Sequence, residues 1–245
     1  MKKRHIAIFL LIALGWASCK KDDHEETHEK VTLHLHTMVG SKAADYTSTF
    51  TSESGRAFTL SDLRYYLSNF VLIKEDGSEV PIAGTVILAS PNEHEWELGT
   101  APSGHYSGIR FLVGLDSVTN HGDPSVYPAN HPLAPQTPSI HWSWNTGYIF
   151  MKIEGKVDTT LSATGTPNAD FYYHIGLDQM AREVTIRDMH VHIEKGGENS
   201  FHVAFDLLKA LKGVDMRTER ATHTMDNMML AQKIADNWPE SFSAE

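Results

Sequence analysis

The chain has 245 residues, of which 41% are hydrophobic and 21% charged, and these values are typical of a soluble globular protein with a substantial core. That length suits one large β domain or two small ones. The formal net charge of −10 argues against a nucleic-acid partner, because phosphate binding requires a basic face. Histidine is unusually frequent, with 15 copies against a single cysteine.

The first 18 residues have the pattern of a bacterial secretory signal. The basic residues 2–4 precede the apolar run 6–14, and small residues lead to Cys19. The apolar run is too short to span a bilayer. A cysteine directly after Ala-Ser resembles a lipobox, in which the thiol is acylated, although Trp16 stands where leucine is usual. We therefore expect residues 1–18 to be a lipoprotein signal peptide and Cys19 to carry the lipid, with an ordinary secreted protein as the alternative.

Residues 19–30 are predicted to be a flexible tether, because KKDDHEETHEK is polar throughout. Acidic residues after a lipidated cysteine also resemble the surface-export signals of some Gram-negative lipoproteins. The expected location is therefore the outer membrane, on its periplasmic or cell-surface face. Once Cys19 is lipidated the chain has no free thiol, which excludes cysteine nucleophiles, disulfides and cysteine-type zinc or iron–sulfur sites.

From residue 31 onward, short strands separated by Gly, Pro, Asn and Asp dominate the pattern. Residues 31–39, VTLHLHTMV, alternate between apolar and polar side chains, as a strand with one buried face does. The segment 57–69, AFTLSDLRYYLSN, is expected to form a short helix that Thr59 or Ser61 can cap. Residues 70–82 predict a hairpin that turns at Asp76-Gly77. Further strands are predicted in TVILAS, HYSGIRFLVGL, GYIFMKIEGKV, FYYHIG, REVTIRD, MHVHIEKG and SFHVAFDL.

A long loop and two helical pieces complete the pattern. Residues 116–139 contain five prolines and no periodicity, which predicts a functional or wrapping loop. Helices are expected at residues 206–212 (DLLKALK) and 226–238 (DNMMLAQKIADNW). Many strands and few helices indicate an all-β fold, an antiparallel β-sandwich or barrel-like domain with long loops and a short C-terminal helix. No proline-rich linker divides residues 31–245, which we interpret as a single domain.

Two pairs of histidines have the spacing of strand ligands. His34 and His36 share one strand face, as do His190 and His192. Because side chains two residues apart point the same way, two imidazoles can converge on one zinc or copper ion. Histidine is also tolerated on any half-exposed strand face, so the spacing leaves both interpretations open.

His174 and His223 have less ordinary neighbours. His174 stands in FYYHIG, where aromatic side chains limit the hydration of an imidazole, which then needs a carbonyl, a carboxylate or a metal as partner. His223 stands in ATHTMD before the last predicted helix and is followed by Met225, Met228 and Met229. Histidine and methionine together suit a soft ion such as Cu(I). The alternative is that the methionines fill core space under the helix.

Several other chemistries lack their sequence signatures. The chain contains no GxSxG nucleophile motif and no glycine-rich phosphate loop. HExxH occurs once, at residues 24–28 (HEETH), but in the segment predicted to be a tether, whereas zinc binding by this motif requires a helix. A metal hydrolase on a (β/α)8 barrel would need alternating helices, which the pattern does not predict. Paired carboxylates for glycoside hydrolysis stay open, because sequence does not give their separation.

Six segments form an ordered set along the chain: LHLHTMVGS, LSDLRYYLSNFVLIKEDG, YSGIRFLVGLDSVTNHGDP, HPLAPQTPSIHWSWNTGYIFMKIEG, FYYHIG and ATHTMD. Together they resemble the MbnP-like family of secreted copper-binding proteins, which are also found as lipoproteins. The segments cover nearly all of the chain after the predicted signal. The string W-x-W-N-x-G-Y-x-F-x-x-x-E-G, from Trp142 to Gly155, is the most specific of them.

The resemblance implies a β-rich extracytoplasmic protein linked to copper acquisition. Some members hold copper with histidines and an oxidised tryptophan, which a di-haem protein resembling cytochrome c peroxidase (MbnH-type) converts to kynurenine. Carried onto this chain, the candidates for that residue are Trp142 and Trp144, which can also be simple anchors at a strand end. Indole has no lone pair to offer a metal, whereas the opened ring exposes an amine and a carbonyl. The chain departs from the family pattern in having His141, an added ligand or an exposed loop residue.

These observations lead to one favoured hypothesis and one alternative. We expect a non-enzymatic copper-binding lipoprotein of the cell envelope, on which a di-haem partner acts. The candidate copper ligands, in order of preference, are His174, His223, His36, His34, His190 and His192. The alternative is a metal-free module of the cell surface that binds a glycan or a protein through exposed aromatic side chains, namely Trp96, Trp142, Trp144 and Trp238.

Overall fold

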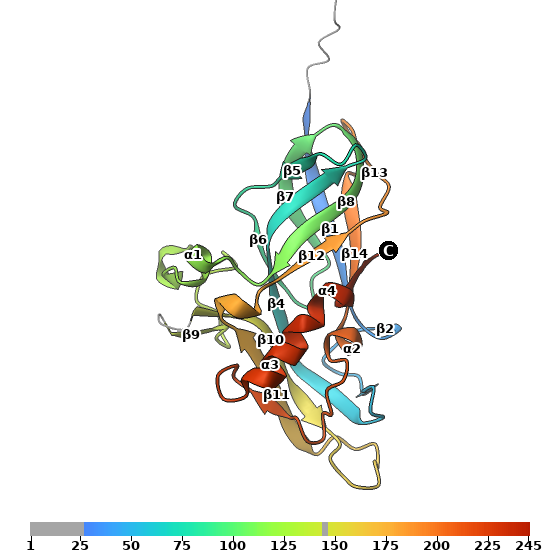
Figure 1. Cartoon of the computed structure of the whole chain (residues 1–245), viewed down its shortest axis with the longest axis vertical. Coiled ribbons are helices and arrows are strands. Elements are labelled where there is room, and N and C mark those ends of the chain that lie inside the picture. The colour runs from blue at the N-terminus through green and yellow to red at the C-terminus, as the bar shows by residue number, and fades with distance from the viewer. Residues whose placement is uncertain (1–26, 144–146) are drawn as a thin grey trace, which may run out of the picture.

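The computed structural model describes residues 27–143 and 147–245. The protein is elongated and β-rich, and its C-terminal short helices lie together (Figure 1). The predicted signal peptide, Cys19 and the first part of the predicted tether lie outside these residues, and so does Trp144. Within the two described ranges, no helix is long and apolar enough to cross a membrane.

The smaller sheet is built around β1, which lies between β14 and β7. Its strands are β1 (His28–Val39), β2 (Lys42–Ala43), β7 (Glu95–Pro102), β14 (Ser200–Asp206) and β16 (Phe242–Ala244). β14 runs parallel to β1, whereas β2 and β7 run antiparallel to it. The alternation predicted for residues 31–39 is confirmed, because Val31 and Leu33 are buried while His34 and His36 lie on the opposite face.

β1 begins at His28, so the tether boundary expected at residue 30 is wrong by three residues. Residues 28–30 pair with residues 100–102 of β7. Their polar side chains gave the pattern of a tether, but the pairing of backbone N–H and C=O groups does not depend on apolar side chains and extends the strand.

The larger sheet is built around the long strand β4. Its strands are β3 (Phe50–Thr51), β4 (Ala57–Lys74), β5 (Glu79–Pro81), β6 (Val86–Ala89), β8 (Gly104–Val113), β9 (His141–Ser143), β10 (Gly147–Val157), β11 (Ala169–Gly176), β12 (Arg182–Ile186), β13 (Val191–Ile193) and β15 (Ala221–Thr222). In the described chain the main order is β12-β8-β4-β10-β11-β15, with the shorter strands beside β4, β8 and β10.

The two sheets pack face to face around one buried cluster. Tyr65 of β4 lies 4.7 Å from Phe205 of β14, and Tyr106 of β8 lies 6.3 Å from Phe201, measured between ring centroids. Such aromatic contacts contribute about 0.5–1.5 kcal/mol each beyond the burial of their area. The predicted all-β sandwich or barrel-like fold is confirmed, and it also contains the parallel pairs β1–β14 and β11–β15.

The short helix predicted for residues 57–69 is wrong, because these residues belong to β4. β4 pairs with β10 along its first half and with β6 and β8 along its second half. Residues 62–63 and 65–68 of β4 are buried, so both faces of its middle part are covered and the alternation that would distinguish a strand from a helix is lost there. The hairpin predicted at Asp76-Gly77 is confirmed by the pairing of β4 with β5.

The helices are short and lie mainly toward the C-terminus (Figure 1). They are α1 (Ser117–Asn120), η1 (Pro124–Val126), η2 (Asp178–Met180), α2 (Leu207–Ala210), α3 (Met228–Asp236) and α4 (Trp238–Ser241). The helix predicted at residues 226–238 is thus confirmed. The loop predicted at residues 116–139 contains α1 and η1 and wraps the larger sheet, where the hydroxyl of Tyr148 donates to the Leu133 carbonyl at 2.7 Å.

Candidate metal centre

Three adjacent strands of the larger sheet place two rows of charged and aromatic side chains on one face. From β4 through β10 to β11, the first row is Arg64, Lys152 and His174, and the second row is Asp62, Glu154 and Tyr172. Residues directly opposite each other in neighbouring strands have their Cβ atoms about 4.5–5.5 Å apart. The register of the sheet alone therefore brings these side chains into contact.

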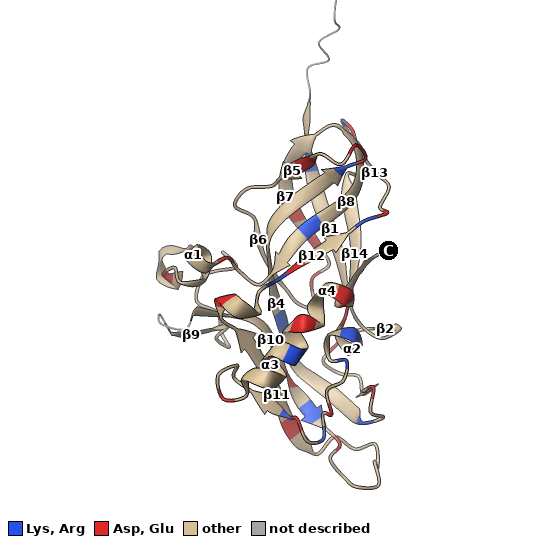
Figure 2. Ribbon diagram, in the orientation of Figure 1, with Lys and Arg blue, Asp and Glu red and all other residues tan. Residues whose placement is uncertain are grey.

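A chain of ion pairs joins the two rows and ends at His174. Arg64 donates to both carboxylate oxygens of Asp62, at 2.7 and 2.5 Å. Lys152 Nζ lies 3.2 Å from Asp62 Oδ2 and 3.1 Å from Glu154 Oε1. The same Glu154 oxygen lies 2.7 Å from His174 Nε2. Figure 2 shows basic and acidic residues side by side on the neighbouring strands at this end of the sheet.

His223 reaches the same face from the loop that follows β15. Thr224 holds this loop against β11, because its hydroxyl donates to the His174 carbonyl at 2.8 Å and accepts from the Gly176 N–H at 3.0 Å. The imidazoles of His174 and His223 consequently lie 4.9 Å apart between centroids, with an interplanar angle of 76°. The ring of Tyr172 lies 4.6 Å from that of His223.

Each imidazole of this pair has a carboxylate beside one ring nitrogen. Glu154 Oε1 lies 2.7 Å from His174 Nε2, and Asp226 Oδ2 lies 3.0 Å from His223 Nδ1. An ionised carboxylate only accepts hydrogen bonds, so in the neutral rings these nitrogens carry the protons. The lone pairs then stand on His174 Nδ1 and His223 Nε2. Histidines that ligate metals usually have their other ring nitrogen placed in this way.

Burial keeps one of these rings in the form that a metal requires. Desolvation lowers the pKa of His174, and the hydrogen bond with Glu154 opposes that effect only in part. The His174 side chain is 13% exposed, whereas that of His223 is 48% exposed. The pair thus stands at the edge of a hollow of about 480 Å³, which Glu154 and Tyr172 also line. A neutral, accessible imidazole is the ligand form.

Trp142 lies on the same face of β11 as His174. A Cβ on Gly176 would meet Trp142 Cζ3 at 3.0 Å and the Tyr148 carbonyl oxygen at 2.6 Å, so glycine leaves the space that the indole occupies. Because side chains alternate along a strand, position 176 faces the same way as position 174, about 7 Å further along. The structure therefore places an indole against Gly176, two residues along β11 from His174.

The family model MbnP matches residues 28–229, from the start of β1 into α3. The chain belongs to the MbnP family. Among solved structures, MbnP from Methylosinus trichosporium is similar to it, with 17% sequence identity, a TM-score of 0.57, and coverage of 81% of this chain and 84% of that chain. At this identity the likeness shows the fold. No curated protein matches the chain. The resemblance to the MbnP family inferred from the six sequence segments is confirmed.

The histidines of β1 in this MbnP-family protein lie in the other sheet. The ring of His34 stacks on that of His202 in β14 with centroids 4.7 Å apart, and the ring of His36 lies 5.7 Å from that of His94. β1 and β11 belong to different sheets. His34 and His36 therefore do not join the His174–His223 pair.

β13 lies at the end of the molecule opposite β11 (Figure 1); it contains His192, and His190 directly precedes it. Both are exposed, and the ring of His192 stacks on that of His105 in β8 at 4.3 Å. His141, whose role the sequence leaves open, packs edge-on against Tyr148 at 4.7 Å, and burial lowers its pKa. Its Nε2 atom has no hydrogen-bond partner among the described residues.

The donor atoms of the pair fit copper, although the pair does not form a complete ligand set. In the part of the chain that the structure describes, no group of three or more His, Cys, Asp or Glu side chains is arranged to hold a metal ion. Free imidazole nitrogens on His174 and His223 are ligands that copper prefers. Met225 and Met229 are 61% and 85% exposed, so they do not fill the core as the alternative interpretation required, whereas Met228 packs against it.

Sequence reasoning did not identify Glu154 and Asp226. A signal for Glu154 exists, since Lys152 and Glu154 are charged residues within a mostly apolar strand and imply partners on its neighbours. For Asp226, the local signal is its position three residues after His223. The histidine partner of Glu154 becomes known only with the register of β10 and β11, and that of Asp226 only with the conformation of the loop after β15.

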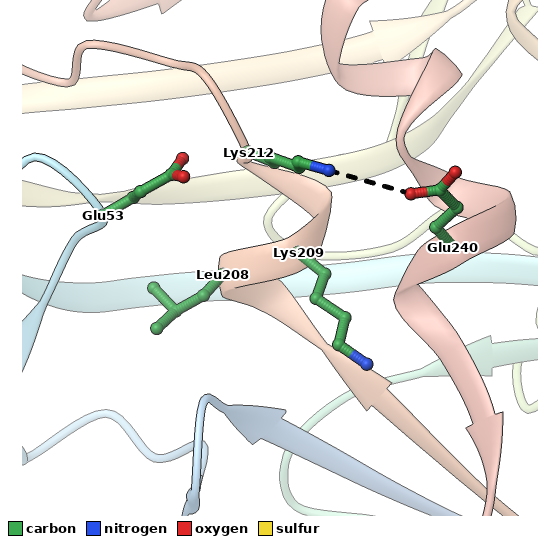
Figure 3. A pocket seen from close by; sticks show the side chains of 5 residues that line it. All are labelled: Glu53, Leu208, Lys209, Lys212 and Glu240. Carbon is green, nitrogen blue, oxygen red and sulfur yellow. Dashed lines mark ion pairs between the residues drawn. The ribbon is translucent and has the colours of Figure 1, made fainter.

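A larger hollow of about 530 Å³ lies beside α2 and α4 and offers no comparable donors (Figure 3). Its lining residues are Glu53, Leu208, Lys209, Lys212 and Glu240. Lys212 Nζ lies 3.9 Å from Glu240 Oε2, and both side chains are mostly exposed. An exposed pair of this kind contributes little, and the hollow has no imidazole that could ligate copper.

Proposed function

We propose that this protein is an extracytoplasmic copper-binding lipoprotein of copper acquisition or homeostasis, with its copper site at His174 and His223. The observation that carries the proposal is the pair of imidazoles 4.9 Å apart, each with a carboxylate on one nitrogen and a lone pair on the other. Membership of the MbnP family and the family's link with copper support it.

Copper is favoured over other ions by the donor set. Cu(I) accepts low coordination numbers and prefers imidazole and thioether ligands, so two histidines are sufficient to hold it. The exposed thioethers of Met225 and Met229 follow His223 closely in the chain and supply the soft donors of that environment. A hard cation such as Ca²⁺ would instead require six to eight oxygen ligands.

Trp142 is the proposed substrate of a di-haem partner of the MbnH type. Its indole lies against Gly176 on the His174 face, where opening of the ring to kynurenine would place an aromatic amine and a carbonyl beside the two imidazoles. Trp144 is the second candidate and lies outside the described residues. In this proposal the protein is acted upon and is not itself an enzyme.

The proposed location is the outer membrane, with the chain anchored through lipid on Cys19 and facing the periplasm or the cell surface. The lipobox-like sequence and the polar residues that follow it support this location. A single lipid-bearing terminus leaves the sheet faces free to meet a soluble or membrane-bound partner.

Copper titration of the mature protein tests the site. We expect His174→Ala and His223→Ala each to weaken copper binding by more than about 100-fold, which exceeds the 10–100-fold effect of an outer-shell residue. His121→Ala is the matched control, because His121 also pairs with a carboxylate, that of Asp178 at 3.3 Å, and is 45% exposed. Equal affinities of the His174→Ala variant and the control would refute the proposal.

Intact-mass measurement tests the modification. Conversion of one tryptophan to kynurenine adds one oxygen atom and removes one carbon atom overall. The mass of protein co-expressed with the di-haem partner should therefore rise by the mass of an oxygen atom minus that of a carbon atom. A Trp142→Phe variant should lose the shift if Trp142 is the substrate, and a Trp144→Phe variant should lose it if Trp144 is. An unchanged mass in the presence of an active partner would refute this part of the proposal.

The aromatic binding module is less well supported than the copper protein. Trp238 is fully buried, so it cannot belong to an exposed platform. Trp96 and Trp142 are partly buried and pack against the core. A stacking platform requires exposed ring faces, and these three tryptophans do not provide a shared one.

A further inference from the structure

The outer face of the smaller sheet carries a second group of imidazoles, which we call the histidine face. Its residues are His34 and His36 of β1, His94 and Glu95 at the start of β7, His202 of β14 and the C-terminal Glu245. None of these side chains lines the hollow beside His174. The group is therefore separate from the copper site proposed above.

Register places three of these side chains in one row across three strands. His34 in the central strand β1 stands opposite His202 of β14 on one side and opposite Glu95 of β7 on the other. The rings of His34 and His202 are nearly parallel, with an interplanar angle of 18° and centroids 4.7 Å apart. Glu95 Oε2 lies 3.7 Å from His34 Nε2. Two imidazoles and a carboxylate thus share one patch of sheet surface.

We infer that His34, His202 and Glu95 form a second metal site, for a borderline divalent transition-metal ion such as Zn²⁺ or Cu²⁺. Zinc–nitrogen bonds of about 2.0–2.1 Å in a tetrahedral site place two nitrogens about 3.3 Å apart, a separation that two stacked rings reach by rotation about their side-chain torsions. Imidazole and carboxylate are the donors that such ions accept together. The carboxylate also offsets part of the positive charge of the ion.

The adjacent row strengthens the attraction of this face for cations. His36 Nδ1 lies 2.6 Å from Glu245 Oε2, and the ring of His94 is 5.7 Å from that of His36. The two carboxylates Glu95 and Glu245 thus pair with imidazoles, which are neutral when they act as ligands. Their negative charge then faces an approaching cation.

The second site should bind more weakly than a buried one. The His34 side chain is 27% exposed and that of Glu95 is 62% exposed, and no three such ligands already converge within the described chain. Binding must therefore fix exposed side chains, which costs conformational entropy. The donors nevertheless stand on paired strands, which hold their backbones in register.

Zinc titration of the full mature chain with the substitutions His174→Ala and His223→Ala tests the inference, because this background removes the imidazole pair of the proposed copper site. We expect about one equivalent of Zn²⁺ to bind, and His202→Gln or His34→Gln to weaken that binding at least about tenfold, as expected for the loss of one metal ligand. His121→Gln is the control and should leave it unchanged. Circular dichroism checks that each variant is folded.

Two results would overturn the inference: no zinc binding in the background variant, or binding that His202→Gln and His34→Gln leave intact. The inference does not rest on the proposed copper function. That function is judged by the effect of His174→Ala on copper affinity in the wild-type chain, so either proposal can fail without the other.

Discussion

Substitution of Glu154 tests whether the carboxylate beside His174 tunes a metal ligand. Glu154 Oε1 holds His174 Nε2 at 2.7 Å and Lys152 Nζ at 3.1 Å. In Glu154→Gln the amide oxygen can still accept the proton of His174, so the tautomer is kept while the charge is lost. In Glu154→Ala both are lost, and the ring is free to reorient.

Outer-shell carboxylates of metal-binding histidines are worth about 10–100-fold in affinity, or about 1.4–2.8 kcal/mol. We therefore expect copper affinity to fall about tenfold in Glu154→Gln and nearer 100-fold in Glu154→Ala. Both variants should also lose about 1–3 kcal/mol of unfolding free energy, because Lys152, whose side chain is 7% exposed, loses one of its two carboxylate partners and keeps Asp62 and the more distant Ser139 carbonyl.

Competition titration with a chromophoric copper chelator measures the affinities, and thermal unfolding of the apo-protein shows that the variants fold. Asp170→Asn is the matched control, since Asp170 lines the same hollow but pairs with Lys156 at 2.6 Å and is 77% exposed. A folded Glu154→Ala variant with copper affinity within about twofold of the wild type, where about 10–100-fold is expected, would refute the reasoning.

Two further predictions follow from His174 and Gly176. Burial lowers the pKa of His174, so as the pH falls the imidazole takes up a proton in the unfolded chain before it does so in the native protein. The free energy of unfolding therefore decreases below about pH 6.5. Urea unfolding between pH 5 and 7.5 should show a weaker loss of stability in His174→Gln than in the wild type, and parallel curves would contradict this. In Gly176→Ala the added Cβ would meet the Tyr148 carbonyl oxygen at 2.6 Å and the Trp142 ring at 3.0 Å. We expect a loss of about 1–3 kcal/mol with a change in tryptophan fluorescence, and an unchanged unfolding midpoint would count against the close contact.

The parts of the fold that sequence predicted are those with a local periodic signal. The alternation of residues 31–39, the Asp76-Gly77 turn and the helix at residues 226–238 each depend on neighbours within one element. The strand β4 was mistaken for a helix at residues 57–69 because both faces of its middle part, residues 62–68, are largely buried, which removes that signal. The parallel pairing of β1 with β14 joins segments more than 160 residues apart and has no local signature.

Sequence likewise predicted one part of the candidate site, the two histidines, and not the other part, their carboxylate partners. The aromatic neighbours of His174 and the His-Met cluster around His223 can be recognised in the sequence, and they pointed to the two residues that the structure brings together. Their carboxylate partners depend on the register between β10 and β11 and on the loop after β15. Register is a tertiary property, because a shift by one residue moves every side chain to the other face.

The register of the smaller sheet shows that the two histidines of the HxH spacing on β1 stand in different rows. His34 and His36 share a face, but each has its ring neighbour outside β1: His202 of β14 for His34, and His94, the residue just before β7, for His36. Donors in one row are brought together by adjacent strands, whereas the two histidines of HxH are about 7 Å apart along their own strand.

The row arrangement predicts unequal effects of two otherwise similar substitutions. In the His174→Ala, His223→Ala background, His34→Gln should weaken zinc binding at least about tenfold, whereas His36→Gln should change it less than about threefold, because only the former removes a ligand of the proposed row. Chelation by the HxH pair itself would make both substitutions equally damaging. Isothermal titration of the two variants distinguishes these cases, and equal losses would assign the ion to β1 alone and remove His202 and Glu95 from the site.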